Sequence, residues 1–333
     1  MDLSDNKEPS FTNFMHINII SRSNGVGLDQ DAKLIQSALE ADGMSATLSH
    51  CRAIAPWAGF IGSQKEKYDV NIFLERCFPR WFHTATVNLL IPNQERFPER
   101  HLKHLKRIDA VLCKSQHALE IFQKHQRSEF IGFSSPDRNC PEINPDYQSV
   151  IHLAGKSTLK GTEDLLGLWG KHPEWPTLTL IQYHSNAPDS VPKNVELISK
   201  YLSNDELSQQ LNHHGIHLCP SRSEGWGHYI VEAMSCSAVV VTTDAPPMNE
   251  LVTAERGVLV PYTKTEPRHL GTNFYINEGN LEQQLSALFK AQCSDKAQLG
   301  LAARQWFDEN HARFSERLPE VARQVARQVA RGK

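Results

Sequence analysis

Short apolar segments alternate with longer amphipathic segments along most of the chain. The apolar runs are rich in β-branched residues and predict buried strands, and the segments with helical spacing between them predict helices. Strands are predicted at 15–21, 45–48, 70–74, 87–91, 110–113, 130–133, 150–153, 178–182, 195–198, 216–219, 238–242 and 257–260. Helices are predicted at 29–41, 99–106, 115–124, 163–171, 205–212, 228–236 and 281–291. This repeated alternation is typical of α/β folds with parallel sheets covered by helices.

The alternation is interrupted once, and this divides the chain into two domains. Pro141 and Pro145 lie close together in a polar stretch that suits neither element and predicts a linker. We therefore expect two Rossmann-like, doubly wound domains at 14–145 and 146–303, preceded by a disordered tail at 1–13 and followed by C-terminal helices at 304–333. Because open parallel sheets bind ligands at the carboxyl ends of their strands, a cleft is expected between the two sheets.

Composition narrows the class of protein. The 333 residues are 40% hydrophobic, enough for two domains, and the net charge of −3 excludes the basic character of a nucleic-acid-binding chain. The sequence has a polar N-terminus and no apolar run of membrane-spanning length, which predicts a cytoplasmic protein. Seven cysteines without a Cys-x-x-Cys pair suit a reducing compartment and predict no structural zinc site.

The stretch from 216 to 241 carries the strongest chemical signal. It predicts a strand, a loop with the Gly225-Trp226-Gly227 turn, a helix and a second strand. Free backbone N–H groups at such a helix start favour an anion. Glu224 lies in the loop, and Glu232 lies among apolar residues, where a carboxylate usually has a partner. The alternative is that Glu224 only complements the helix dipole and Glu232 points to solvent.

The pattern Pro-Ser-x-x-Glu-Gly-aromatic-Gly-x-x-x-x-Glu-Ala-Met resembles the signature of the GT-B retaining glycosyltransferases of family four, which include sucrose synthase-like enzymes and bacterial mannosyl- and glucosyltransferases. In that family the two glutamates also stand eight positions apart. The resemblance implies that Glu224 and the amides from Gly225 through Trp226 and Gly227 to His228 hold the sugar hydroxyls. It also implies that amides around Tyr229 neutralise the diphosphate, that Glu232 accepts hydrogen bonds from the ribose, and that Tyr201 lies near the base.

A second signal is the loop between Gly155 and Gly161. It imitates a P-loop, but Val150 stands where a P-loop needs glycine, which disfavours a nucleotide triphosphatase. The loop resembles the glycosyltransferase segment in which two cations hold the donor diphosphate, here Lys156 and Lys160. Lys156 replaces the usual arginine, which keeps the charge but loses bidentate geometry. Two solvated lysines are the alternative.

The N-terminal half resembles the family only in outline. Gly25-Val-Gly27 resembles the glycine loop that approaches the diphosphate, although glycines are common at any strand-to-helix turn. Asp29-Gln-Asp31 spells a metal-binding Asp-x-Asp, but its place at a helix start predicts capping, and we reject the metal interpretation.

Two further features of this half bear on the acceptor and on membranes. The family's strand-end histidine is not evident, since the comparable segments read Leu74-Glu75-Arg76 and Ile91 to Arg96; His83 is only a loose candidate. The basic helix at 100–107, with leucines three apart, predicts a solvated face, with peripheral contact to the inner face of the membrane as the alternative.

Together these observations predict a metal-independent, retaining glycosyltransferase that moves a hexose from a UDP- or GDP-linked sugar to a hydroxyl acceptor. The acceptor could be a glycan, a lipid-linked glycan or a small molecule. No cofactor beyond this donor, and no nucleic acid, is expected. The alternatives are a non-catalytic sugar-nucleotide-binding subunit, or a GT-B enzyme of other chemistry such as an epimerase or a phosphorylase.

Overall fold

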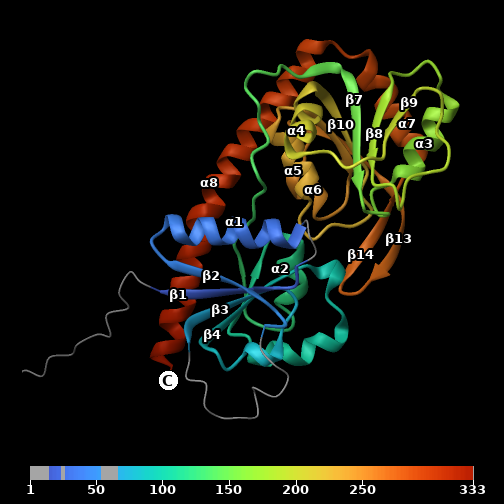
Figure 1. The fold of residues 1–333 in the computed structure, drawn as a ribbon. Coiled ribbons are helices and arrows are strands. Elements are labelled where there is room, and N and C mark those ends of the chain that lie inside the picture. The colour runs from blue at the N-terminus through green and yellow to red at the C-terminus, as the bar shows by residue number, and fades with distance from the viewer. Residues whose placement is uncertain (1–14, 24–26, 54–66, 333) are drawn as a thin grey trace, which may run out of the picture.

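The computed structural model describes residues 15–23, 27–53 and 67–332. They form two domains, each built around a six-stranded parallel sheet with helices packed against it. One long helix runs along both domains (Figure 1). The α/β class and the two doubly wound sheets predicted from the apolar periodicity are confirmed.

The first sheet has the strand order β2-β1-β3-β4-β5-β6. Its strands are β1 (His16–Ser21), β2 (Ser45–His50), β3 (Tyr68–Glu75), β4 (Ala85–Pro92), β5 (Ala110–Cys113) and β6 (Ser128–Phe130). Its helices are α1 (Gly27–Ala41) and α2 (Gln116–Phe122), with 3₁₀ helices η1 (Pro79–Trp81), η2 (Gln94–Arg96) and η3 (Glu99–Arg107).

Two predictions for this domain need correction. The strand predicted at 130–133 lies earlier in the chain, at β6. It ends before Gly132, which takes a positive φ of 67° and turns the chain out of the sheet. The helix predicted at 99–106 is the 3₁₀ helix η3. A 3₁₀ helix has three residues per turn, so Leu102 and Leu105 stack along one side and both pack against the core. This leaves its basic side chains on the outside.

The second sheet has the order β12-β11-β10-β7-β8-β9. Its strands are β7 (Asp146–Gly155), β8 (Leu178–Gln182), β9 (Val195–Ile198), β10 (His214–Cys219), β11 (Val239–Thr243) and β12 (Gly257–Val260). Its helices are α3 (Thr162–Lys171), α4 (Asn204–His213), α5 (His228–Ser235), α6 (Met248–Leu251) and α7 (Glu278–Lys290).

The antiparallel hairpin of β13 (Tyr262–Arg268) and β14 (Gly271–Ile276) was not predicted from the sequence. β13 is mostly exposed, so it has no apolar alternation to mark it as a strand. Leu270 N–H, in the turn of the hairpin, donates to the Gln94 carbonyl of η2 at 3.2 Å. The hairpin therefore reaches from the C-terminal domain to the N-terminal domain.

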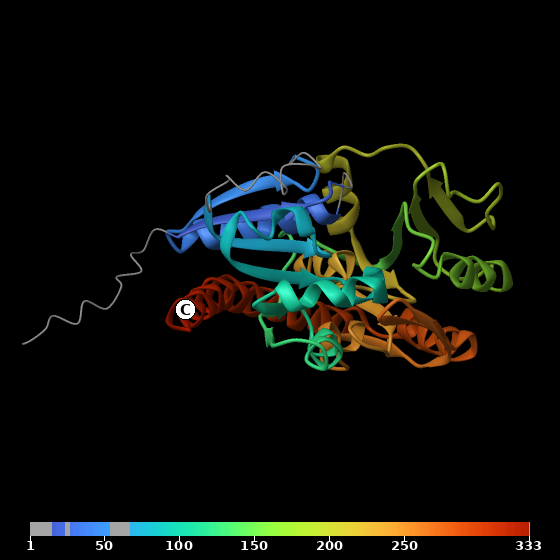
Figure 2. The same cartoon turned by 90° about the horizontal axis from the view of Figure 1, so that it is seen from below.

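The last element, α8 (Cys293–Arg331), is one helix of 39 residues. The predicted boundary at 304 falls inside it, so the separate C-terminal helices expected there are a continuation of the same helix. α8 packs on α5 in one domain and on α1 in the other, and Figure 2 shows it passing beneath both sheets. Phe307, Phe314 and the period-four stripe of Val321 and Val325 are buried along it, because residues four apart share a helix face. The core is therefore continuous between the domains.

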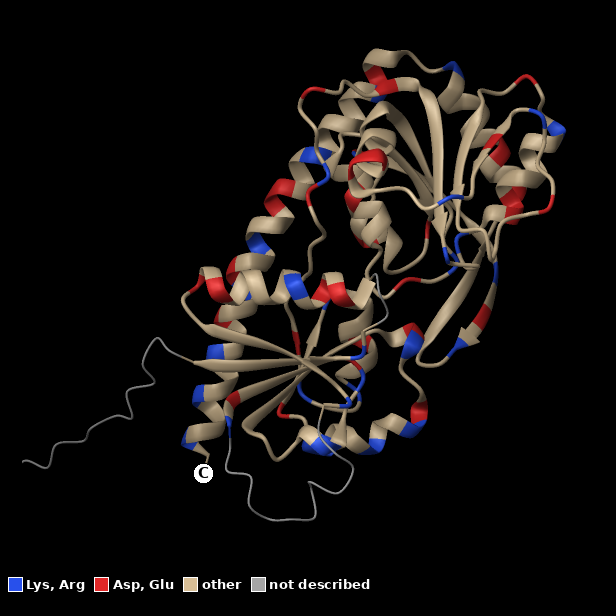
Figure 3. Cartoon of the chain, in the orientation of Figure 1, with Lys and Arg blue, Asp and Glu red and all other residues tan. Residues whose placement is uncertain are grey.

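Charges of both signs are spread over both domains (Figure 3). Within the described ranges, the structure contains no helix with the length and apolar character needed to span a bilayer.

Candidate active site

A cavity of about 480 Å³ lies between the domains, at the carboxyl ends of strands from both sheets. The N-terminal domain lines it with α1, with the last residue of β3 and with the segments that follow β4 and β5. The C-terminal domain lines it with the loops after β7 and β10, with the start of α5, and with residues 200–202 before α4. The expected cleft is therefore present as a cavity in the structure.

The loop after β7 brings two lysines to this cavity. Gly155 and Gly161 bound it with positive φ values of 57° and 69°, and a Cβ atom on Gly161 would lie 2.5 Å from the Pro220 carbonyl oxygen. Only glycine fits there, so the lysine loop packs directly on the loop after β10. His152, beneath the loop, bonds the Leu218 carbonyl at 2.7 Å and the Thr162 hydroxyl at 3.0 Å. Its burial lowers its pKa to about 4, so it is a neutral structural contact.

The two lysines differ in environment. Lys160 is largely buried; its ammonium donates to Glu224 Oε1 at 2.8 Å and lies 3.1 Å from the centre of the Tyr229 ring. Lys156 is exposed, and its ammonium lies 4.8 Å from the centre of the Tyr183 ring. Both line the cavity, as predicted.

Glu224 and the turn that follows it face the N-terminal domain. Besides Lys160, Ser221 donates its hydroxyl to Glu224. A Cβ atom on Gly225 would lie 2.7 Å from the Asn93 side chain, so the turn needs glycine to approach the opposite domain. Gly227, with a φ of 110°, precedes α5 and leaves the first amides of that helix, at His228 and Tyr229, without intrahelical partners.

Glu232 is 6% exposed and also paired. It accepts from Gln30 Nε2 at 2.8 Å, and Arg138 Nη2 lies 3.5 Å away. Both of these partners and Glu232 line the cavity. The alternative in which Glu224 only complements a dipole and Glu232 points to solvent is therefore wrong for both residues.

The structure corrects the interpretation that Asp31 caps a helix. Asp31 does not cap α1; instead its carboxylate is buried and binds Lys114 Nζ at 2.6 Å and His228 Nε2 at 2.7 Å. Burial alone would raise the pKa of Asp31, but Lys114 and His228 outweigh it and lower that pKa to about 2. Since His228 belongs to the C-terminal domain, this charged cluster ties the two domains together at the cavity wall.

The remaining predicted residues fall in several places. Gly25 lies outside the described residues, whereas Gly27 begins α1 and lines the cavity together with Trp226. Tyr201 lines the cavity as well and is 80% exposed. His83 lies in a different surface hollow, with Lys106 and Arg107. Across the described ranges, no group of three or more His, Cys, Asp or Glu side chains is placed to hold a metal ion.

Sequence reasoning missed several lining residues, namely Asn93, Glu95, Lys114 and Arg138. The first three follow strands β4 and β5, where the position at a strand end was the only available signal. Arg138 lies in the interdomain linker, whose composition indicates only a loop.

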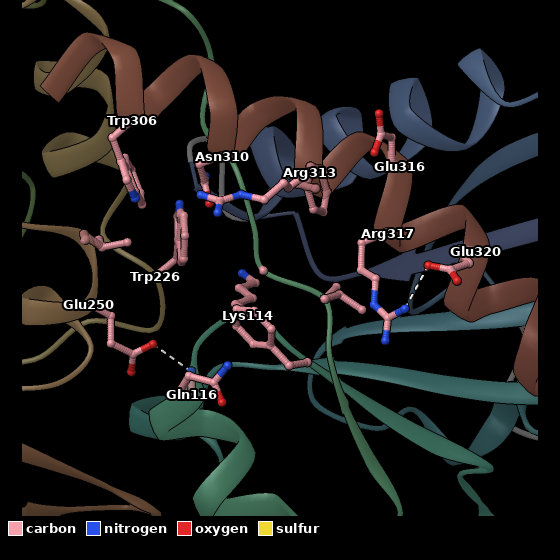
Figure 4. A pocket seen from close by; sticks show the side chains of 15 residues that line it. Lys114, Gln116, Trp226, Glu250, Trp306, Asn310, Arg313, Glu316, Arg317 and Glu320 are labelled. Carbon is pink, nitrogen blue, oxygen red and sulfur yellow. Dashed lines mark hydrogen bonds and ion pairs between the residues drawn. The ribbon is translucent and has the colours of Figure 1, made fainter. Parts of the chain in front are cut away.

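Trp226 and Lys114 also line a second cavity, of about 510 Å³, between α8, α2 and α6 (Figure 4). Several of its charged groups have partners within the protein: Glu250 accepts from the backbone N–H of Gln116 at 2.7 Å, and Arg317 binds Glu320 at 2.8 Å. These contacts are typical of an interface between domains, so we assign the candidate active site to the first cavity.

Comparison with known proteins gives a family match for part of the chain. Residues 190–287, in the C-terminal domain, match the family model described as glycosyl transferases group 1. No curated relative matches the chain significantly.

Solved structures resemble the whole chain. A glycosyltransferase from Rickettsia africae has a TM-score of 0.70 at 12% identity, with 97% of this chain and 100% of that chain covered. Anabaena HepE in complex with UDP and glucose has a TM-score of 0.64 at 15% identity, with 96% and 99% covered. The GtfA/B complex has a TM-score of 0.56 at 15% identity; 77% of this chain is covered, and the chain spans 57% of that longer protein. At these identities the likeness shows the fold, which is GT-B, and with the domain match it supports a glycosyltransferase.

Proposed function

We propose that the protein transfers a hexose from a nucleotide-diphosphate sugar, UDP-linked, to a hydroxyl acceptor, with retention of configuration and without a metal ion. One observation carries this proposal. The two lysines and two glutamates of the sequence motifs converge, with the start of α5, on one cavity between the domains. The choice of UDP is supported by the similarity to HepE, which was solved with UDP and with UDP-glucose.

The lysines and the α5 amides would stabilise the leaving group. When the bond between the anomeric carbon and the diphosphate breaks, negative charge builds on the nucleoside diphosphate. Fixed positive groups aimed at that charge lower the barrier. Lys156, Lys160 and the amides of His228 and Tyr229 supply such groups from adjoining loops.

The glutamates would bind the two sugars of the donor. Carboxylates accept hydrogen bonds from hydroxyl groups, and Glu224 and Glu232 present carboxylates to the same cavity. Glu224 would hold the transferred hexose and Glu232 the ribose. Because Lys160 binds Glu224 in this structure, donor binding would make Lys160 bridge the hexose-binding carboxylate and the diphosphate.

Metal independence is proposed from this arrangement of charge, and retention is proposed from the resemblance of the two-glutamate signature to retaining enzymes. The cationic groups offset the diphosphate charge that Mg²⁺ or Mn²⁺ otherwise offsets. In the retaining scheme the acceptor approaches on the face from which the diphosphate leaves, and its proton passes to the departing oxygen.

The test begins with a thermal-shift screen against UDP, GDP and ADP sugars, followed by turnover of the donor that stabilises the protein. Activity should survive exhaustive EDTA treatment, and the anomeric coupling constant of the product should match that of the donor. Loss of activity that Mn²⁺ restores, or a product of opposite configuration, would contradict the proposal. Binding without turnover of any donor would favour a nucleotide-binding subunit instead.

A further inference from the structure

Glu95 is a buried carboxyl group at the edge of the candidate site. It lies in η2, directly after β4, and lines the cavity from the N-terminal domain. It is 6% exposed, and its Oε2 atom is buried without a hydrogen-bond partner among the residues that the structure describes. Its Oε1 atom lies 3.8 Å from Arg96 Nε, too far for a hydrogen bond. A buried polar atom without a hydrogen-bond partner lowers the stability of the fold. A ligand that hydrogen-bonds to this carboxyl group would remove that cost.

Two segments of the C-terminal domain pack against the chain around Glu95. The neighbouring Gln94 donates its side-chain amide to the Glu224 carbonyl at 3.0 Å. On the other side, Gly271 of the hairpin packs so closely that a Cβ atom there would lie 3.2 Å from Glu95 Cα. The carboxyl is therefore held beside the Glu224 loop, which the proposed function assigns to the transferred hexose.

The charges around Glu95 place its ionisation near neutral pH. Burial raises the pKa of Glu95, whereas a hydrogen bond from its own backbone N–H lowers it. The negative Glu224 raises this pKa further, and Arg96 and Lys114 lower it; the resulting pKa is about 7. Within the hairpin, the charged residue Arg268 pairs with Gly271, the residue that packs on Glu95. A group with such a pKa can change its hydrogen-bonding character over the physiological range.

We propose that Glu95 binds the attacking hydroxyl of the acceptor and accepts its hydrogen bond. This rests on the proposed function and adds the acceptor subsite to it. In the transfer step the hydroxyl oxygen forms a bond to the anomeric carbon while the bond to the diphosphate breaks. The hydroxyl first donates its proton in a hydrogen bond to Glu95, which positions the oxygen for attack. As negative charge builds on the departing diphosphate oxygen, the proton turns from Glu95 to that oxygen and is transferred there, so Glu95 stays ionised throughout.

Only the ionised form of Glu95 suits this role. A carboxylate accepts from the hydroxyl and leaves an oxygen lone pair free to attack. A protonated carboxyl would instead donate to the hydroxyl oxygen and occupy a lone pair. The ionised fraction rises with pH, so the rate should rise through about pH 7.

The test uses hydrolysis of UDP-glucose, in which water takes the place of the acceptor hydroxyl. The full-length wild type is compared with Glu95→Gln, and Glu99→Gln is the control because Glu99 is an exposed glutamate on the adjoining η3. We expect Glu95→Gln to lower kcat about 10- to 100-fold, the range for losing a hydrogen bond to a charged group, with little change in KM for UDP-glucose. The wild-type kcat/KM should rise between about pH 5.5 and about pH 8.5 with a midpoint near 7, and Glu95→Gln should lose this rise.

The outcomes separate this inference from the proposed function. If the wild type binds and hydrolyses UDP-glucose but Glu95→Gln keeps its rate and pH profile, the role of Glu95 is overturned and the donor site stands. If Glu95→Gln loses UDP affinity by calorimetry together with its rate, Glu95 is a structural or donor contact, and the inference is also overturned. If the wild type binds none of the UDP, GDP and ADP sugars of the thermal-shift screen, or turns over none that it binds, the proposed function fails and this inference fails with it.

Discussion

The two domains have nearly the same architecture but use the sequence differently at the shared cavity. The C-terminal domain supplies its cavity residues from compact segments, with Lys156 and Lys160 in one loop and Glu224 to Glu232 in the next loop and helix. The N-terminal domain supplies its cavity residues from α1 and from the segments after β4 and β5, where residues such as Gln30, Glu95 and Lys114 do not form a motif. The arrangement in the C-terminal domain produces a motif that can be recognised in the sequence, and the arrangement in the N-terminal domain does not.

This difference has a physical basis in the ligands that the proposal gives to each domain. A diphosphate demands several donors at fixed spacing, and one loop packed on one helix start provides them. An acceptor hydroxyl demands only one or two well-placed polar groups, which different loops can provide. The comparison can be tested by removing contacts from each domain.

The largest effect should come from the charged cluster that joins the domains. Replacing Asp31 with asparagine leaves Lys114 and His228 without their buried carboxylate. Removing one partner of a buried ion pair typically costs about 3–5 kcal/mol of unfolding free energy. Chemical denaturation should measure this loss. Asp29→Asn, on the same helix but with Ser23 as a partner at 2.9 Å, is the control and should cost much less.

The pH dependence gives this prediction a second check. The pKa of Asp31 is lowered in the folded state to about 2, so its stabilising contribution is present above its unfolded pKa of about 4 and is lost as pH falls toward 2. The stability difference between wild type and Asp31→Asn should therefore persist at neutral pH and shrink in acid. A difference that stays constant below about pH 3 would show that Asp31 does not act through its charge.

Lys160 should carry the next largest effect, on the C-terminal side of the comparison. Replacing Lys160 with alanine removes a cation from the proposed diphosphate site and also removes the partner of Glu224. Turnover should fall by about 10²–10³, as when one fixed transition-state donor is lost. Lys171→Ala, which removes an exposed lysine of α3, should leave turnover unchanged. A folded Lys160→Ala protein with near-wild-type turnover would contradict the assignment.

The sequence predicted this half of the site better than the other because the C-terminal residues are neighbours along the chain. Apart from the strand predicted at 130–133, the strands of both sheets were found, since buried parallel strands are short apolar runs in either domain. The hairpin was missed because β13 is exposed, and the extent of α8 was missed because its path along both domains is a tertiary feature. Asp31 was assigned to capping because its partners Lys114 and His228 are distant in sequence, and local pattern carries no information about such contacts.

Glu232 should have a smaller effect, confined to binding of the nucleotide. Glu232→Gln removes a carboxylate that now accepts from Gln30 at 2.8 Å and that we assign to the ribose. Calorimetry with UDP should show a loss of about 1.5–3 kcal/mol, the range for a hydrogen bond to a charged group. Glu224→Gln should leave UDP affinity nearly unchanged and suppress transfer. The reverse order would mean that the hexose and ribose ends are exchanged.

The smallest effect should come from Tyr201, at the exposed end of the cavity. Its side chain is 80% exposed although it lines the cavity, which suits an aromatic surface that gains a partner when a base stacks on it. Stacking of a base on an aromatic residue contributes about 1–3 kcal/mol. Because Tyr201 stays open to water, we expect the lower end, about 1 kcal/mol, or roughly a fivefold increase in the Kd for UDP on Tyr201→Ala. Tyr201→Phe keeps the ring and should bind UDP like the wild type. If Tyr201→Phe weakened binding as much as Tyr201→Ala, the hydroxyl group would be the contact, and the base would not stack on the ring. If neither variant changed the Kd, the base would lie elsewhere in the C-terminal domain. Tyr201 would then not belong to the part of the site that the sequence predicted.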